Sequence, residues 1–346
     1  MRPKILTGSF IFLFILGAAF FFNKPIRKET SISVVKAGLT VVGEGEKKQK
    51  LKTVKVWVAP DTNSIPNNKE GELIKYGQKL ISNTSEYLGP RGSVANISNG
   101  MNCQNCHLNA GRNSFSNHFA KVASGYPRFR PRSARIETIE FRVNDCLERS
   151  LNGQKLDSLS EEMRAFVAYF KWIGKDVRRE DDIEDAAVEV LPFMKRAAVP
   201  ANGKILYLSK CKVCHGSNGE GLLRHDSLAY IYPPLWGPDS YNIGAGLHRL
   251  TRLAGFIKNN MPFGSTYQNP QLSDEEAWDI AAYISSQPRP AKDLSDDWPK
   301  LSSKPFDYPF GPYTNGFTEE EHKYGPFGPI KRANENLKAN EKKRAE

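Results

Sequence analysis

Two copies of the motif Cys-x-x-Cys-His, at residues 103–107 and 211–215, constrain the fold of this chain more than any other feature. On one turn of helix, positions i, i+3 and i+4 share a face, so the two thiols and the imidazole of each motif converge. This arrangement suits a porphyrin, whose two vinyl groups bond the thiols while the histidine binds the iron. The motif is the attachment signature of c-type haem, and we predict two covalently bound haem c groups.

A zinc site and a thiol–disulfide pair are the alternatives for such cysteines. Zinc usually takes four ligands from two paired clusters, whereas each motif here has its own helical surroundings. A thiol–disulfide pair would not need a following histidine twice. The residues assigned to haem attachment and to the two irons are therefore Cys103, Cys106, His107, Cys211, Cys214 and His215.

The sequence around the two motifs repeats in the same order. A short helical segment precedes each motif and an amphipathic one follows it, at 71–81, 160–173, 202–209 and 273–285. Ser273 and Glu276 form a capping box, which marks the start of the last of these helices. We expect a mostly α-helical protein of two class I cytochrome c-like domains in tandem, each built around one haem, with little regular β structure.

The N-terminus carries an export signal. Arg2 and Lys4 precede an apolar run over residues 5–22, and a basic start before a hydrophobic segment is typical of exported proteins. The run is near the lower length limit for a membrane-spanning helix. Both a cleaved signal peptide and an uncleaved anchor in the inner membrane therefore remain open, and either one predicts a periplasmic protein.

Six regions follow from these patterns. They are a signal peptide or N-terminal membrane anchor (1–23), a polar tether (24–56), a first cytochrome c domain (57–185), a linker (186–201), a second cytochrome c domain (202–290) and an extended wrapping tail with a charged end (291–346).

The net charge of +11 favours anionic partners. No nucleic-acid-binding motif accompanies this charge, so we expect no nucleic acid partner. Small anions or an acidic redox partner are the classes that fit.

The second haem has one obvious candidate for its other axial ligand. Met261 is the only methionine that follows His215, and it precedes Pro262 in a loop before the last helix. This placement resembles that of the small class I cytochromes c. His225 and His248 are interpreted as surface residues.

The first haem has less usual candidates. Met163 lies inside an amphipathic segment and suits core packing better than ligation, which leaves His118 and Cys146. A lone cysteine is often only a small core residue, but arginines crowd the segment around Cys146. They are Arg128, Arg130, Arg132, Arg135, Arg142 and Arg149. Clustered guanidiniums favour a thiolate and bind small anions, although a solvated basic face would have the same composition.

With these residues in view, the chain resembles the thiosulfate dehydrogenase family of dihaem cytochromes c. The matching stretches are Tyr76-Gly77, 87–90, 100–111, 126–130, 142–150 and the second haem motif with Met261. The most specific of them is 142–150, which contains Cys146 and which generic cytochromes lack.

The resemblance implies residue roles at both haems. It implies His107 and Cys146 as ligands of the first iron, and arginines and a serine around the substrate, carried over here to Arg142, Ser150 and Arg132. Some relatives have a lysine directly before the methionine of the second haem that exchanges with it on reduction. Asn260 occupies that position here, which argues against such an exchange.

The function implied is that of an oxidoreductase. The family oxidises two thiosulfate ions to tetrathionate at the first, active-site haem. Electrons then leave through the second haem to an external cytochrome c or another redox acceptor. The alternatives are a non-catalytic dihaem electron-transfer protein and a tetrathionate reductase that uses the same site.

Overall fold

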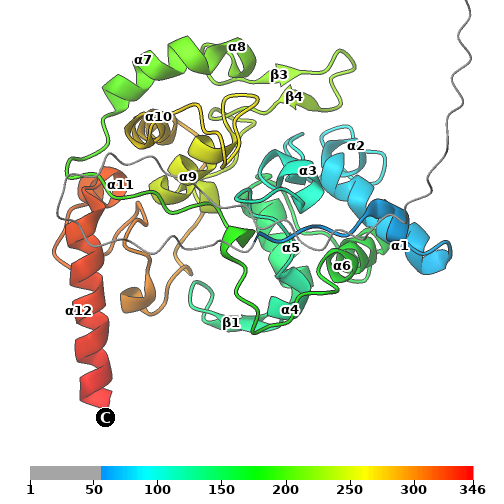
Figure 1. Cartoon of the computed structure of the whole chain (residues 1–346), viewed down its shortest axis with the longest axis horizontal. Coiled ribbons are helices and arrows are strands. Elements are labelled where there is room, and N and C mark those ends of the chain that lie inside the picture. The colour runs from blue at the N-terminus through cyan, green and yellow to red at the C-terminus, as the bar shows by residue number, and fades with distance from the viewer. Residues whose placement is uncertain (1–55, 346) are drawn as a thin grey trace, which may run out of the picture. The chain divides into compact units, whose positions relative to one another are not determined.

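The computed structural model describes residues 56–345. The predicted signal peptide or anchor (1–23) and the tether up to residue 55 lie outside the described residues. Within the described part, no helix is long and apolar enough to cross a bilayer. This part is mainly helical with two short hairpins, as predicted (Figure 1).

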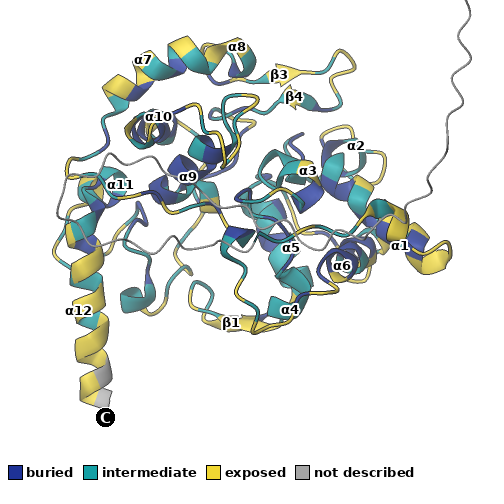
Figure 2. Cartoon of the chain, viewed as in Figure 1, coloured by how far each residue is buried: buried dark blue, intermediate teal, exposed yellow. Residues whose placement is uncertain are grey.

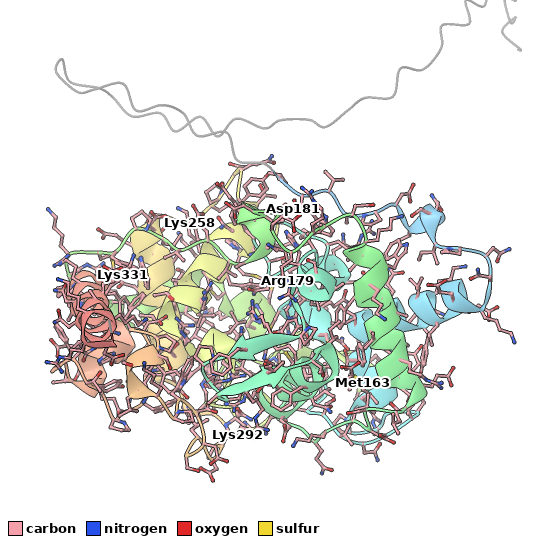
Figure 3. The ribbon with its side chains drawn as sticks, turned by 90° about the horizontal axis from the view of Figure 1, so that it is seen from below. Met163, Arg179, Asp181, Lys258, Lys292 and Lys331 are labelled. Atoms are coloured by element: carbon pink, nitrogen blue, oxygen red, sulfur yellow. The ribbon has the colours of Figure 1, made fainter. Side chains whose placement is uncertain are left out.

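The first helical domain surrounds the first haem motif. Its helices are α1 (Lys69–Ser82), α2 (Thr84–Leu88), α3 (Leu108–Gly111), α4 (Val122–Gly125), α5 (Ile139–Arg149) and α6 (Glu161–Ile173). The side chain of Asn68 caps α1 and that of Ser160 caps α6. These two helices pack against each other (Figure 1). Met163, labelled in Figure 3, is fully buried in this core, so its predicted core packing is confirmed.

The second helical domain repeats this arrangement around the second motif. Its helices are α7 (Pro200–Lys210), α8 (Lys212–His215), α9 (Leu250–Asn260) and α10 (Asp274–Ser286). The predicted capping box of Ser273 and Glu276 begins α10. Trp278 and Tyr207 are fully buried where α10 packs against α7 and α9, and Figure 2 shows dark blue, buried residues along α9 and α10.

One glycine in each domain lets the first and last helices come into contact. A Cβ atom added to Gly77 of α1 would lie 2.0 Å from the carbonyl oxygen of Ala165 in α6. A Cβ atom added to Gly203 of α7 would lie 1.8 Å from the carbonyl oxygen of Asp279 in α10. Both distances are far inside van der Waals contact, so each helix crossing requires glycine.

Two short antiparallel hairpins are the β structure of the described residues. β1 (Arg128–Arg130) pairs with β2 (Arg135–Glu137), and β3 (Leu222–Leu223) pairs with β4 (Tyr230–Tyr232). The first hairpin carries arginines into the neighbourhood of the first haem motif. Single-turn 3-10 helices lie at Thr62–Ser64, Cys103–Asn105, Glu184–Ala186, Gly246–His248 and Leu301–Ser303.

A polar seam joins the two domains. The backbone N–H of Asn242 donates to the carbonyl of Arg149 (3.1 Å), and its side-chain amide donates to the carbonyl of Glu148 (2.8 Å). The side chain of Asn99 donates to the carbonyl of Ser240 (3.1 Å). The segment around residue 242 in the second domain therefore lies directly against the C-terminal end of α5.

The tail differs in part from its prediction as an extended segment. It contacts the first domain through the N–H of Trp298, which donates to the carbonyl of Arg132 (2.8 Å). Its end, however, forms α11 (Glu319–Tyr324) and α12 (Phe327–Ala345). The extended prediction is wrong for these residues, because Thr318 and Glu321 form a capping box and charged residues are compatible with a helix.

The long helix α12 packs into the second domain at its start, and near its end Glu341 pairs with Lys300 (3.1 Å) and accepts from the hydroxyl of Ser302 (3.0 Å). Phe327 and Ile330 are buried in the core of the second domain, and the ammonium of Lys331, labelled in Figure 3, lies 5.7 Å from the ring centre of Phe193. Figure 2 shows that the rest of α12 is mostly exposed.

Candidate active site

The first haem motif presents its histidine in a defined tautomer. The Nδ1 of His107 lies 2.6 Å from the carbonyl oxygen of Asn117. A carbonyl only accepts, so Nδ1 carries the proton and the lone pair lies on Nε2, ready for a metal. Burial, followed by the charge of Arg142, lowers the pKa of His107 to about 4, while the bond to Asn117 opposes this. The imidazole is therefore neutral, as metal ligation requires.

A cavity of about 450 Å³ adjoins this motif. Cys103, Cys106, His107 and Cys146 all line it. Much of the remaining wall is apolar or aromatic, from Ile81, Phe119, Val122, Ile139, Val143, Leu147, Phe166 and Phe170. Two attachment sulfurs, a neutral imidazole and an apolar wall fit a haem: Cys103 and Cys106 would hold its edge and His107 its iron.

Cys146 reaches this cavity because of its place on α5. Alternating intervals of three and one residue put six positions on one face of this helix. They are 139, 142, 143, 146, 147 and 150, and all six line the cavity. Burial, followed by the charge of Cys146, raises the pKa of Cys106 to about 12. Cys146 is thus within electrostatic range of the attachment sulfur.

His118, the other candidate ligand, is occupied elsewhere. Its Nε2 lies 3.3 Å from a carboxylate oxygen of Asp185, and both side chains are fully buried. Its Nδ1 accepts from the N–H of Ala120 (3.3 Å), and the ring of Trp57 stacks on it at 4.5 Å. His118 also lines the cavity, but its Nδ1 is hydrogen-bonded and its Nε2 faces the carboxylate of Asp185, which favours Cys146 of the two candidates.

The arginines predicted around the substrate divide into two groups. Arg142 and Ser150 line the cavity, and so do Arg128 and Arg130. Arg132 is not among the lining residues: its guanidinium binds the carboxylate of Asp145. The charge of Cys146, opposed by burial and reinforced by Asp145, raises the pKa of Arg142. Arg142 is therefore positively charged beside Cys146.

Asp145, which the sequence analysis did not single out, organises these arginines. Its carboxylate binds Arg132 and Arg142, and it accepts from Nε of Arg149 at 2.7 Å. Arg149 in turn forms a bidentate ion pair with Asp297 of the tail, with N···O distances of 2.7 and 2.8 Å. Burial alone would raise the pKa of Asp145, but Arg142, Arg132 and Arg149 lower it. Its position directly before Cys146, between Arg142 and Arg149, was the available signal.

The second domain also contributes to the cavity of the first haem motif. Gly246, Leu247, Arg249 and Arg252 line it. Arg249 is neutralised by the buried carboxylate of Asp307, which accepts from its Nε at 2.8 Å. Burial, followed by the charge of Arg249, lowers the pKa of Arg252. No sequence signal near the first motif pointed to these two arginines.

The second haem motif has the same histidine arrangement as the first. The Nδ1 of His215 lies 2.9 Å from the carbonyl oxygen of Pro233, which again leaves Nε2 as the lone-pair nitrogen. Burial lowers the pKa of His215. Met261 follows α9 directly and packs on the same core as Cys211. The preceding Asn260 donates from its side chain to the carbonyl of Phe115 in the first domain (3.2 Å).

The two histidines predicted to lie on the surface differ. His225 is exposed, as predicted. His248 is only 8% exposed, so its prediction is wrong. The reason is the tail, because Phe310 stacks on the imidazole of His248 with the ring centres 5.6 Å apart.

Comparisons with known proteins agree with this architecture. The family model "SoxA/TsdA, cytochrome c domain" matches residues 93–177, and the family model "Cytochrome c" matches residues 200–288. Both matched regions contain a complete attachment motif. The chain thus contains two cytochrome c domains, each of which binds a haem c covalently.

Several relatives match along most of the chain. A thiosulfate dehydrogenase of Psychrobacter arcticus is 40% identical over 245 residues, which cover 69% of this chain and 71% of that protein. One of Allochromatium vinosum is 34% identical over 269 residues, which cover 77% and 96%.

A solved structure shares the fold. The thiosulfate dehydrogenase TsdBA from Marichromatium purpuratum matches with a TM-score of 0.63 and 29% identity, over 72% of this chain and 51% of that one. This chain therefore spans about half of that protein's length. By these similarities in sequence and fold, the chain belongs to the thiosulfate dehydrogenase family of dihaem cytochromes c.

Proposed function

We propose that this protein couples two thiosulfate ions to one tetrathionate ion and passes the two electrons to an external redox acceptor. The balanced reaction joins the outer sulfurs of two S₂O₃²⁻ ions in S₄O₆²⁻ and releases two electrons. The observation that carries the proposal is the position of Cys146 and Arg142 on one face of α5, in the cavity next to the first haem motif. The relatives named thiosulfate dehydrogenase support it.

Electrostatics explain why this cavity needs arginines. Two unit charges 4 Å apart interact by about 4 kcal/mol at an effective dielectric constant near 20, so two dianions repel each other by about 16 kcal/mol. Arg128, Arg130 and Arg142 bring positive charge to the cavity wall. Arg142 pairs with Asp145, and Arg130 lies 3.7 Å from the buried carboxylate of Glu137, so carboxylates hold these guanidiniums at the cavity wall before an anion binds.

The neutral histidines of the two motifs and the cavity position of Cys146 support the ligand sets that we propose. We assign His107 and Cys146 to the first iron, and His215 and Met261 to the second. Thiolate ligation lowers a haem's reduction potential and methionine ligation raises it. When bound, the haems supply one-electron chemistry that carries the electrons from the first site to the second and then to a cytochrome c or similar acceptor.

The protein's own residues divide the remaining work. Cys146 presents a soft sulfur to the sulfur substrate. Arg142 and Ser150 face the cavity and are assigned to substrate binding. Arg132 is assigned a positioning role instead, because it holds Asp145 next to Cys146. The predicted location is periplasmic, and the proposed membrane attachment through residues 1–23 lies outside the described residues.

The test is thiosulfate-dependent reduction of ferricyanide by the purified haem-loaded protein, with tetrathionate measured as product. We expect one tetrathionate for every two ferricyanide reduced. Cys146→Gly should abolish turnover while the pyridine haemochrome assay still finds two haems per chain. Turnover by this variant would contradict the role of Cys146. A wild-type protein that reduces tetrathionate but does not form it would instead establish the reductase.

A further inference from the structure

Arg252 is a cation on an otherwise buried stretch of helix. In α9, every other residue from Leu250 to Ile257 is buried, whereas Arg252 is half-buried. Arg252 lines the cavity next to the first haem motif, although it belongs to the second domain. Arginine is rarely placed on a core helix unless its charge has a partner, because burial of a lone cation costs free energy. The position of Arg252 therefore calls for a partner in the cavity.

Arg252 differs from the other arginines that line this cavity. Three of them have a carboxylate nearby, in the pairs Arg130 with Glu137, Arg142 with Asp145, and Arg249 with Asp307. A fourth, Arg128, is exposed to solvent. Among residues 56–345, the guanidinium of Arg252 forms neither an ion pair nor a hydrogen bond. Arg252 is thus the half-buried arginine of this cavity whose charge no described carboxylate balances.

The neighbouring Arg249 increases the need for a counter-charge. Burial, followed by the charge of Arg249, lowers the pKa of Arg252, and the charge of Asp307 only partly opposes this. Asp307 is already used, since it accepts from Nε of Arg249 (2.8 Å) and from the hydroxyl of Thr251. An anion bound to Arg252 would supply a second negative charge and offset the repulsion between the two arginines.

The guanidinium group selects the kind of anion. Its parallel N–H groups match two oxygens of one carboxylate or SO₃ group. This cavity has two sources of such a group. One is the SO₃ end of thiosulfate or tetrathionate, and the other is a carboxylate of the haem that Cys103 and Cys106 would attach.

We propose that Arg252 is the residue through which the second domain binds an oxyanion in the cavity of the first haem motif. The oxyanion is an SO₃ group of the substrate or a carboxylate of the haem. The substrate source rests on the proposed function, whereas the haem source requires only haem attachment. In both cases the anion site of the first domain is completed by a side chain of the second.

The test measures anion binding to the full haem-loaded chain in its oxidised state, by isothermal titration calorimetry at low ionic strength. Sulfate and tetrathionate are the titrants, because neither gives electrons to the oxidised haems. If the oxyanion is the substrate's, Arg252→Gln should raise both dissociation constants about tenfold to a hundredfold, as expected for the loss of one charge-assisted hydrogen bond. Sulfate binding does not depend on the reaction. A wild-type protein that binds sulfate but forms no tetrathionate would therefore refute the proposed function and not the role of Arg252.

Two further variants serve as controls. Arg332→Gln removes the same charge from the exposed face of α12 and should leave both dissociation constants unchanged. Arg252→Lys keeps the charge but loses the parallel N–H groups, so its affinity should lie between those of the wild type and Arg252→Gln. If Arg252→Gln does not accumulate with two haems, Arg252→Lys takes its place, with a smaller expected rise.

Resonance Raman spectra of the same variants identify the source of the oxyanion. If Arg252 binds a haem carboxylate, Arg252→Gln should shift the propionate bending band and leave both dissociation constants unchanged. If Arg252 binds the substrate, the constants should rise and the band should stay. The proposal would be overturned if Arg252→Gln changed neither the dissociation constants nor the band, because Arg252 would then hold no oxyanion.

Discussion

Replacing Asp145 by asparagine tests whether one buried carboxylate organises the active-site arginines. Among the described residues, the change leaves Asp297 as the only carboxylate in an ion pair with the guanidiniums of Arg132, Arg142 and Arg149. Arg132 and Arg149 have only 11% and 13% of their side chains exposed, whereas Arg142 has 34% exposed. The first two pairs should therefore dominate the energy.

Breaking a buried ion pair by removing one partner costs about 3–5 kcal/mol. Asparagine keeps one acceptor oxygen, so we expect Asp145→Asn to lower the free energy of unfolding by about 3 kcal/mol, at the lower end of that range. The arginines lower the pKa of Asp145 in the folded state. Its contribution is thus fully present above the unfolded pKa of about 3.9 and is lost as pH falls through the lower folded pKa.

The assay is denaturant unfolding of the haem-loaded protein at neutral pH, followed by circular dichroism. Asp176→Asn is the control, because Asp176 is exposed and forms no ion pair within residues 56–345. A double-mutant cycle with Arg132→Gln should give a coupling energy between 145 and 132 of about 0.5–3 kcal/mol. A loss below about 1 kcal/mol for Asp145→Asn, the range of exposed ion pairs, would refute the reasoning.

Two further predictions concern the second domain and the tail. Gly203→Ala should destabilise the protein by about 1–3 kcal/mol in denaturant unfolding, because the added Cβ would overlap the carbonyl of Asp279. The control is Gly328→Ala on α12, whose added Cβ would meet no atom closer than 3.5 Å. This control variant should be as stable as the wild type or more stable. Asp307→Asn should lower the free energy of unfolding by about 3 kcal/mol, because it leaves Arg249 without its buried partner. The first prediction would be contradicted if Gly203→Ala lost no more unfolding free energy than Gly328→Ala. The second would be contradicted if Asp307→Asn unfolded with the same free energy as the wild type.

The sequence determined the local chemistry of this protein. Each haem motif brings two thiols and a histidine together within one turn, because their spacing is a property of the helix itself. The capping box at Ser273 and the core position of Met163 follow from spacing along single helices. The face of α5 that carries Arg142 and Cys146 likewise has a helical period.

Only the tertiary structure decided which distant residues share a site. Arg132 lies in the same arginine-rich segment as Arg142, yet it binds Asp145 rather than lining the cavity, because the hairpin β1–β2 directs it there. Arg249 and Arg252 reach the first haem's cavity from the second domain. His248 is buried because a tail residue more than sixty positions away stacks on it.

One physical reason separates the features that the sequence determines from those that only the tertiary structure decides. Attachment motifs, caps and helix faces depend on neighbours within a few residues, and those distances are fixed by helix geometry. Counter-charges and burial depend on which surfaces pack together. The grouping of three arginines around Asp145 is therefore invisible along the chain and is defined only once the domains and the tail have packed.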